Sequence, residues 1–144
     1  MSDALVLPCS SCGRLNRVPA ARLSDVPTCS ACGARLLGAG PAELGPDAFA
    51  RFTERSDLPV VVDFWAPWCA PCRAMAPQFE AATRALAGRA ILCKVNTEDH
   101  PSIAQAHRIG AIPTVVVFRH GREVARHAGA VSASQLETWL EPHL

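Results

Sequence analysis

Three pairs of cysteines, each with two residues between its members, constrain this chain more than any other feature. The seven cysteines divide into these pairs and one remainder: Cys9/Cys12, Cys29/Cys32, Cys69/Cys72 and Cys93. The sequence opens without a basic segment or an apolar run long enough for a secretion signal, so we expect a cytoplasmic protein. Because the cytoplasm is reducing, the pairs favour metal binding or redox catalysis over structural disulfides.

Composition divides the chain at about residue 40. Residues 1–48 hold four of the seven cysteines, whereas every Phe and Trp lies at or beyond Phe49. A segment without large side chains builds only a small core and needs a covalent or metal staple. Glycine and proline at 38–41 and 45–46 indicate a linker or turns. We therefore predict a zinc-binding module over residues 1–40 and a second domain over residues 41–144.

The first two pairs have the spacing of a four-thiolate zinc site, C-x2-C-x16-C-x2-C. Gly13 and Gly33 follow the two pairs directly, where a tight turn often needs a positive φ. The spacing predicts one structural Zn²⁺ per chain, held by four ligands: Cys9, Cys12, Cys29 and Cys32. Two disulfides are one alternative. The other is a redox switch that holds zinc when reduced and forms disulfides when oxidised.

Charge and hydropathy exclude several other classes of protein. Fourteen basic and thirteen acidic residues give a net charge of +1, which argues against a nucleic-acid or anionic-membrane surface. The longest hydrophobic stretch, residues 109–118, is too short to span a bilayer. The sequence has no GxGxxG motif, so we expect no bound nucleotide or flavin.

Hydrophobic periodicity beyond residue 40 predicts an α/β domain with a central mixed sheet flanked by helices. We expect a first helix capped by Asp47, with Phe49 and Phe52 on its buried face. A closing helix is expected at 134–140, capped by Ser132 or Ser134. The other expected segments, in chain order, are a strand at 59–65, a helix at 72–86, a strand at 90–95, a helix at 101–109 and strands at 114–118 and 122–127.

The third cysteine pair lies where the strand at 59–65 gives way to a helix. Unpaired N–H groups and the dipole at a helix N-terminus favour an anion, so we expect Cys69 to be an accessible thiolate. Cys72, one turn further along, is expected to be more buried and to keep its proton longer. Pro71 suits the first turn, where a missing N–H costs nothing. The alternative is a metal half-site that a partner chain completes.

Several motifs together carry a resemblance to a known family. WCAPC follows VVDFW, Lys94 lies in CKVNTE, Ile112 and Pro113 precede Thr114, and Gly129 lies in AGA. These residues resemble the thioredoxin family, and the leading four-cysteine module resembles its zinc-containing bacterial thioredoxin 2 type. The resemblance implies a thioredoxin fold preceded by a small zinc-ribbon-like module.

The resemblance also implies roles for the residues around the third pair. Cys69 would attack a substrate disulfide, and Cys72 would resolve the mixed disulfide. Asp63 would lie buried beneath the pair, where burial raises a carboxyl pKa and lets it take a proton from Cys72. Lys94 would lie near Asp63 and adjust the pKa of its carboxyl. The alternatives are a solvent-exposed aspartate at a strand end and a solvated lysine at a strand edge.

Substrates are expected to meet a surface around the redox pair. Pro113 would form a cis peptide bond facing Cys69, and Gly129 would let a peptide backbone approach. The expected substrate-binding residues are Trp68, Ala70, Pro71, Ile112, Pro113 and Gly129, and an apolar docking patch is expected from Trp68, Ala66, Ile112 and Ala130. The family usually has glycine at position 70, so alanine there bears on the redox potential.

The resulting prediction is a cytoplasmic protein-disulfide reductase, a thiol–disulfide oxidoreductase. Its partners would be disulfide-containing proteins and a flavin-containing, NADPH-dependent thioredoxin reductase, and we expect a monomer. One alternative is a disulfide oxidase or isomerase that works in the opposite direction. Another is a redox sensor or holdase in which loss of zinc exposes a binding surface. Cys93 is interpreted as an inert buried thiol.

Overall fold

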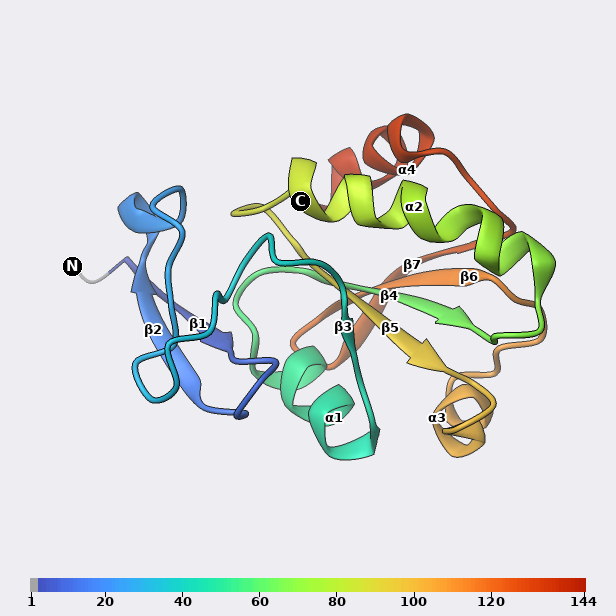
Figure 1. The fold of residues 1–144 in the computed structure, drawn as a ribbon, viewed down its shortest axis with the longest axis horizontal. Coiled ribbons are helices and arrows are strands. Elements are labelled where there is room, and N and C mark those ends of the chain that lie inside the picture. The colour runs from blue at the N-terminus through green and yellow to red at the C-terminus, as the bar shows by residue number, and fades with distance from the viewer. Residues whose placement is uncertain (1–2) are drawn as a thin grey trace.

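The chain forms two sheets of different size, as a computed structural model that describes residues 3–144 shows (Figure 1). An N-terminal hairpin pairs β1 (Ala4–Pro8) with β2 (Leu15–Pro19) in antiparallel fashion. The larger sheet has five strands in the order β3-β5-β4-β6-β7. Strands β3, β5 and β4 run parallel to one another. Strand β6 runs antiparallel to β4, and β7 runs antiparallel to β6. The predicted mixed sheet is therefore confirmed.

The elements follow the predicted order beyond residue 40, with one addition, the short strand β3. Their bounds are β3 (Ala42–Glu43), α1 (Pro46–Arg55), β4 (Val60–Trp65), α2 (Ala70–Ala85), β5 (Ile91–Asn96), α3 (Pro101–Ala106), β6 (Thr114–Arg119), β7 (Arg122–Ala128) and α4 (Ala133–Leu140). Short 3-10 turns occupy Ala20–Arg22 and Glu141–His143.

Alternation along β4 assigns its side chains to two faces of the sheet. Val60, Val62 and Phe64 join the core cluster that contains residues of α1 and α3. Val61 joins the other cluster, which contains residues of α2 and α4. Figure 1 shows α2 and α4 on one side of the sheet and α1 and α3 on the other. Because successive strand residues point to opposite faces, Asp63 faces the same side as Val61, toward α2.

Two helix starts differ from the expected ones because of local capping. Helix α1 has Gly45 as its N-cap and Pro46 in its first turn, so the predicted Asp47 cap is wrong. Proline suits that first position since it lacks an N–H that would be unsatisfied there. Helix α2 begins at Ala70 rather than at Cys72, because Cys69 is its N-cap. Of the two predicted caps for α4, the structure has Ser132, and Gln135 completes a capping box with it.

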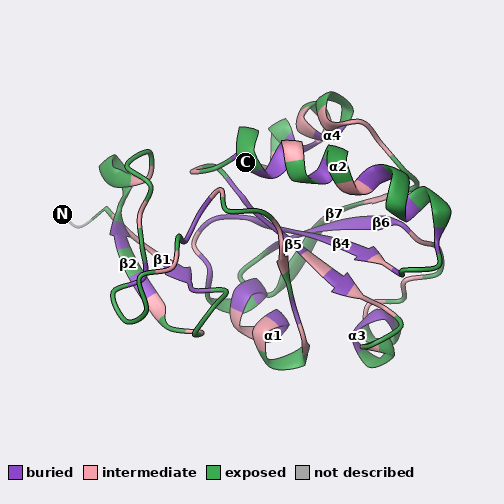
Figure 2. Ribbon diagram, viewed as in Figure 1, coloured by how far each residue is buried: buried purple, intermediate pink, exposed green. Residues whose placement is uncertain are grey.

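The N-terminal hairpin packs onto the larger domain. Leu7 and Val18 of the hairpin belong to the same buried cluster as Phe52 of α1. Two hydrogen bonds join the parts: Val6 N donates to Asp57 Oδ2 at 2.7 Å, and Asp57 N donates to Val6 O at 2.9 Å. Figure 2 shows buried residues in β1, in α1 and in the central strands. This hairpin was not predicted from the sequence.

No helix within residues 3–144 is both long and apolar enough to cross a membrane. The central strands β4, β5 and β6 are almost wholly buried, whereas β7 is mostly exposed at one edge of the sheet (Figure 2).

Candidate redox site and candidate metal centre

Four cysteine sulfurs come together in the N-terminal module. The Sγ atoms of Cys9, Cys12, Cys29 and Cys32 all lie within 4.8 Å of one another. Two separations between the pairs are 3.6 Å, for Cys9 and Cys32, and 3.5 Å, for Cys12 and Cys29. The chain therefore folds back over sixteen intervening residues to join two cysteine turns at one point.

The two turns have the same local construction. Gly13 N donates to Cys9 O, and Gly33 N donates to Cys29 O, each at 2.9 Å. The glycines adopt φ values of 83° and 79°, so the positive φ expected from the sequence is confirmed. In each turn the second residue after the first cysteine donates its N–H to that cysteine's Sγ at 3.4 Å. Such bonds stabilise negative charge on sulfur.

The buried side chain of Asn16 links the two turns. Its Oδ1 accepts from Ser30 N at 2.9 Å and from Ser30 Oγ at 3.2 Å, and its Nδ2 donates to Arg14 O at 3.1 Å. Asn16 thus ties the strand after the first cysteine pair to the start of the second pair. The segment Asn16–Pro19 contributes to the resemblance to the zinc-containing thioredoxins, but the sequence assigned Asn16 no structural role, because its partner lies 14 residues further along the chain.

The four thiols fit a tetrahedral zinc ion. Zn–S bonds are about 2.3 Å, so the sulfurs of a zinc tetrathiolate lie about 3.8 Å apart. The Sγ–Sγ separations of 3.5 and 3.6 Å are close to that edge length. Cys9 and Cys29 are buried while Cys12 and Cys32 are exposed, so the cluster lies at the surface of the module.

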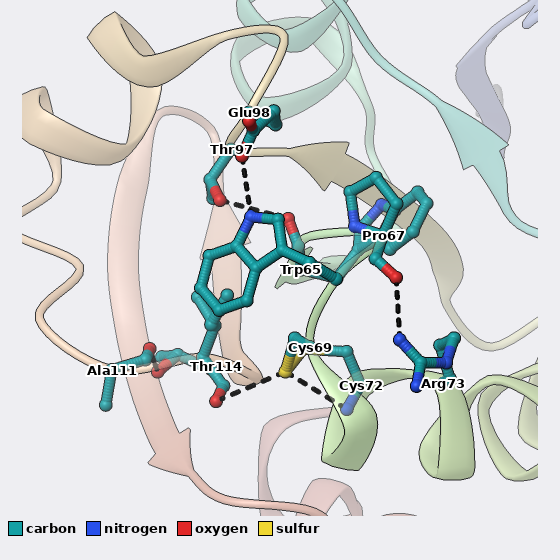
Figure 3. The surroundings of a disulfide bond; sticks show 11 residues. Trp65, Pro67, Cys69, Cys72, Arg73, Thr97, Glu98, Ala111 and Thr114 are labelled. Atoms are coloured by element: carbon teal, nitrogen blue, oxygen red, sulfur yellow. Dashed lines mark hydrogen bonds between the residues drawn. A yellow bond between two sulfur atoms is a disulfide. The ribbon is translucent and has the colours of Figure 1, made fainter.

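The third pair forms a disulfide at the N-terminus of α2 (Figure 3). Cys69 is the N-cap, and its Sγ accepts from Cys72 N at 3.3 Å. Its Sγ also lies 3.8 Å from the carbonyl oxygen of Ile112. The helix start therefore places backbone N–H groups where a thiolate on Cys69 would be stabilised.

The expected openness of Cys69 is not found in this oxidised state. The residue is 5% exposed, against 2% for Cys72. Trp65, Ala66 and Ile112 pack around the disulfide and cover it. The difference in burial between the two cysteines has the predicted direction but is small.

Asp63 is fully buried in the middle of β4, so the alternative of a solvated strand-end carboxylate is wrong. Neither carboxylate oxygen receives a hydrogen bond from any residue in 3–144. Burial raises the pKa of Asp63 to about 7, against the opposing effect of the Lys94 ammonium, and the negative charge of Glu43 raises it further. The side chain can therefore exchange a proton near neutral pH.

Lys94 lies directly across from Asp63. The two are register partners on the adjacent strands β5 and β4, and Lys94 is half-buried. Its Nζ lies 4.3 Å from the centroid of the Trp65 ring, a cation–π contact. The predicted proximity of Lys94 to Asp63 is thus found, and the ammonium rests on an aromatic face beside the redox pair.

The residues expected to meet substrate lie near the disulfide but differ in exposure. Trp68 is 66% exposed, and its Nε1 donates to Glu98 Oε2 at 2.6 Å. Ala70, Pro71 and Gly129 are exposed, Ile112 is half-buried, and Pro113 is buried. Ala66 is fully buried, so its expected place in an apolar docking patch is wrong: its side chain packs inward against the disulfide.

Backbone contacts join the loops around the pair. The Ile112–Pro113 bond is cis, as the resemblance implied. Gly129 N donates to Pro113 O at 2.9 Å, which holds the end of β7 against the start of β6. Cys93 is completely buried in β5, where burial raises the pKa of its thiol well above the usual range, in keeping with an inert thiol.

Sequence reasoning missed two acidic residues of the site, Glu98 and Glu43. Glu98 hydrogen-bonds Trp68, and Glu43 of β3 is the register partner of Lys94 on β5. Each lies at least 22 residues from the side chain that it contacts, so although Glu98 ends the CKVNTE segment, the sequence assigned neither residue a partner.

Comparison with known proteins agrees with this geometry. The family model described as Thioredoxin matches residues 41–142, and the model described as Thioredoxin 2, N-terminal, matches residues 8–34. The chain is 39% identical to Thioredoxin C-3 of Corynebacterium nephridii over 97% of this chain and 96% of that protein. It is 40% identical to Thioredoxin 1 of Nostoc sp. over 72% and 96% of the two chains. The chain belongs to the thioredoxin family: it is a thiol–disulfide oxidoreductase with a redox-active CxxC pair and the zinc ribbon found at the N-terminus of thioredoxin 2.

Proposed function

We propose that the protein is a cytoplasmic protein-disulfide reductase that cycles Cys69 and Cys72 between dithiol and disulfide. The observation that carries this proposal is the disulfide at the N-terminus of α2, on the sheet face that also holds the buried carboxyl of Asp63. A cytoplasmic setting suits the module as well, because four thiolates stay free to bind metal only where thiols remain reduced.

The cycle begins with the reduced pair. The Cys69 thiolate attacks one sulfur of a substrate disulfide, forms a mixed disulfide and releases the other substrate sulfur as a thiolate. Cys72 then loses its proton to Asp63, and its thiolate attacks Cys69 Sγ. This second step releases the remaining substrate sulfur and leaves Cys69 and Cys72 oxidised. Two electrons pass from the pair to the substrate.

Asp63 is the base in this proposal because its pKa of about 7 matches proton exchange at neutral pH. Its place on the α2 side of β4 supports the assignment, since Val61, two residues earlier, packs with Met75 of α2. Cys72 lies one turn before Met75 on the same helix. Lys94 is proposed to limit how far burial raises the pKa of Asp63.

Substrates are proposed to dock across the loops that frame the disulfide. Trp68 offers the largest exposed apolar surface there, and Ala70 and Pro71 lie beside it on the first turn of α2. A partner's extended backbone would lie along Ile112, Pro113 and Gly129. The oxidised pair is proposed to be reduced by an NADPH-dependent thioredoxin reductase, and the enzyme to act as a monomer.

We further propose that residues 1–40 are a zinc-binding module and residues 41–144 the thioredoxin domain. The metal would be one Zn²⁺ held by Cys9, Cys12, Cys29 and Cys32, and the separations between their sulfurs support this donor set. Its chemistry is structural: four thiolates leave no open position for substrate.

Reduction of insulin, with dithiothreitol as the electron source, tests the proposed activity. We expect Cys69→Ser to abolish turnover, because no mixed disulfide can form. Cys93→Ser serves as the matched control, since it removes a buried thiol outside the pair. Unchanged turnover in Cys69→Ser overturns the reductase assignment. Equilibration with glutathione tests the direction: a reduction potential well above the cytosolic poise of about −220 to −260 mV would make the protein an oxidant instead.

A further inference from the structure

A row of three charged residues crosses the strands beneath the redox pair. In the sheet register Glu43 of β3 pairs with Lys94 of β5, and Lys94 pairs with Asp63 of β4. Register partners in neighbouring strands point to the same face, so the three side chains lie on the α2 side of the sheet. The row runs from solvent inward: Glu43 is exposed, Lys94 half-buried and Asp63 fully buried.

Trp65 ties the outer part of this row together. Its Nε1 donates to Glu43 Oε2 at 3.4 Å. The Lys94 ammonium lies over its ring, with Nζ 4.3 Å from the ring centroid. Trp65 also packs against the disulfide. The indole is therefore in contact with the ammonium, with the outer carboxylate and with the redox pair.

We propose that Glu43 is a positioning residue for the redox reaction: through its charge and its hold on Trp65, it determines how readily Asp63 accepts a proton. The inference rests on the proposed role of Asp63 as the base for Cys72. Glu43 touches neither the cysteines nor the expected path of substrate, so it acts only through Lys94, Trp65 and Asp63.

Two effects of Glu43 have the same sign. Its negative charge repels a second negative charge on Asp63, which favours the protonated carboxyl. It also attracts the Lys94 ammonium, which Trp65 holds beside it, and thereby opposes the pull of that ammonium on Asp63. Both effects keep Asp63 protonated to higher pH than Lys94 alone would allow, and the raised pKa of Asp63 has this direction.

Few other groups act on Asp63 from the elements packed against it. Its register partner on β6 is Val115, which is uncharged, and α2 offers the cysteine pair. Among residues 3–144 the charges that act on Asp63 are those of Lys94 and Glu43. The substitution of Glu43 therefore removes one of these two charges, the one that raises the pKa of Asp63, without altering the buried core.

The test is a carbon-13 NMR titration of the Asp63 carboxyl in the oxidised full-length protein, in which Cys69 and Cys72 do not titrate. Strands lie about 4.8 Å apart, so charges two strands apart are about 10 Å distant, and the loss of one shifts the midpoint on the order of half a pH unit. We expect Glu43→Gln to lower the midpoint by this amount. Glu80→Gln, which removes an exposed carboxylate from α2, is the matched control and should leave the midpoint unchanged. An unchanged midpoint in Glu43→Gln, or an equal shift in both variants, overturns the proposal.

Two more variants separate the effects and separate this inference from the proposed function. Glu43→Gln keeps an oxygen that can accept from Trp65 Nε1, whereas Glu43→Leu loses both the charge and the acceptor. A larger shift of the Asp63 midpoint in Glu43→Leu than in Glu43→Gln therefore measures the effect of the hydrogen bond to Trp65. In the reduced protein, Glu43→Gln should raise insulin turnover at pH 6 roughly twofold, because more Asp63 is ionised there. If the Asp63 midpoint moves but turnover does not follow, Asp63 is not the base, and the effect of Glu43 on Asp63 still stands.

Discussion

The buried carboxyl of Asp63 makes folding stability depend on pH in a direction that a single substitution tests. Burial raises the folded-state pKa to about 7 from the ordinary value of 3.8. Between these values the unfolded chain loses its proton while the folded protein keeps it. Folding stability attributable to Asp63 is therefore highest below pH 3.8, falls as pH rises, and levels off above pH 7.

The magnitude follows from the difference in pKa. About three pH units at about 1.4 kcal/mol each give a loss of about 4 kcal/mol by pH 8. Asp63→Asn replaces the carboxyl with an uncharged group of nearly the same shape, so it removes this loss and leaves the packing in place. We compare the free energies of unfolding of the variant and the wild type. Relative to their difference near pH 4, we expect the difference at pH 8 to shift by about 4 kcal/mol in favour of the variant.

Urea unfolding of the oxidised proteins at pH 4, 5, 6, 7 and 8, followed by tryptophan fluorescence, measures this difference. Asp99→Asn is the control, because Asp99 is exposed and its substitution should give a difference that does not change with pH. Parallel stability curves for wild type and Asp63→Asn would refute the reasoning, since they would mean that Asp63 is ionised in the folded protein throughout this range.

Three more predictions follow from other contacts. Trp68→Ala should raise KM for insulin several-fold with a smaller change in kcat, since Trp68 is 66% exposed and its indole Nε1 donates to Glu98 at the surface; steady-state kinetics checks this, and a loss confined to kcat would contradict it. Asn16→Ala should speed zinc release at least tenfold in a chromogenic chelator assay, because Asn16 holds Ser30 in place, whereas exposed Ser24→Ala should have no effect. Burial lowers the pKa of His107, which packs among Phe49 and Phe118, so the contribution of His107 to folding stability should fall as pH drops below 6.5; in urea unfolding, His107→Phe should therefore gain stability relative to the wild type as pH falls through this range.

The fate of the two kinds of cysteine pair follows from local sequence. Pairs that are each followed directly by glycine form turns whose sulfurs converge, and the pair after a run of β-branched residues caps a helix. These outcomes need only short-range rules for turns and helix caps, which is why the cysteine spacing together with the residues next to each pair predicted them. The order of strands and helices beyond residue 40 came from hydrophobic periodicity in the same way.

Tertiary structure decided the features that depend on which distant residues become neighbours. Register placed Glu43 opposite Lys94, 51 positions later in the chain, and Lys94 opposite Asp63. Packing covered Cys69 and buried Ala66, although both stand in a motif that suggested exposure. It also placed the N-terminal hairpin on α1, through contacts such as Val6 with Asp57. The physical reason is that alternation along a strand already determines which face of the sheet each side chain lies on. Burial and charged neighbours depend instead on strand pairing and core packing, which form only when distant parts of the chain come together in the folded protein.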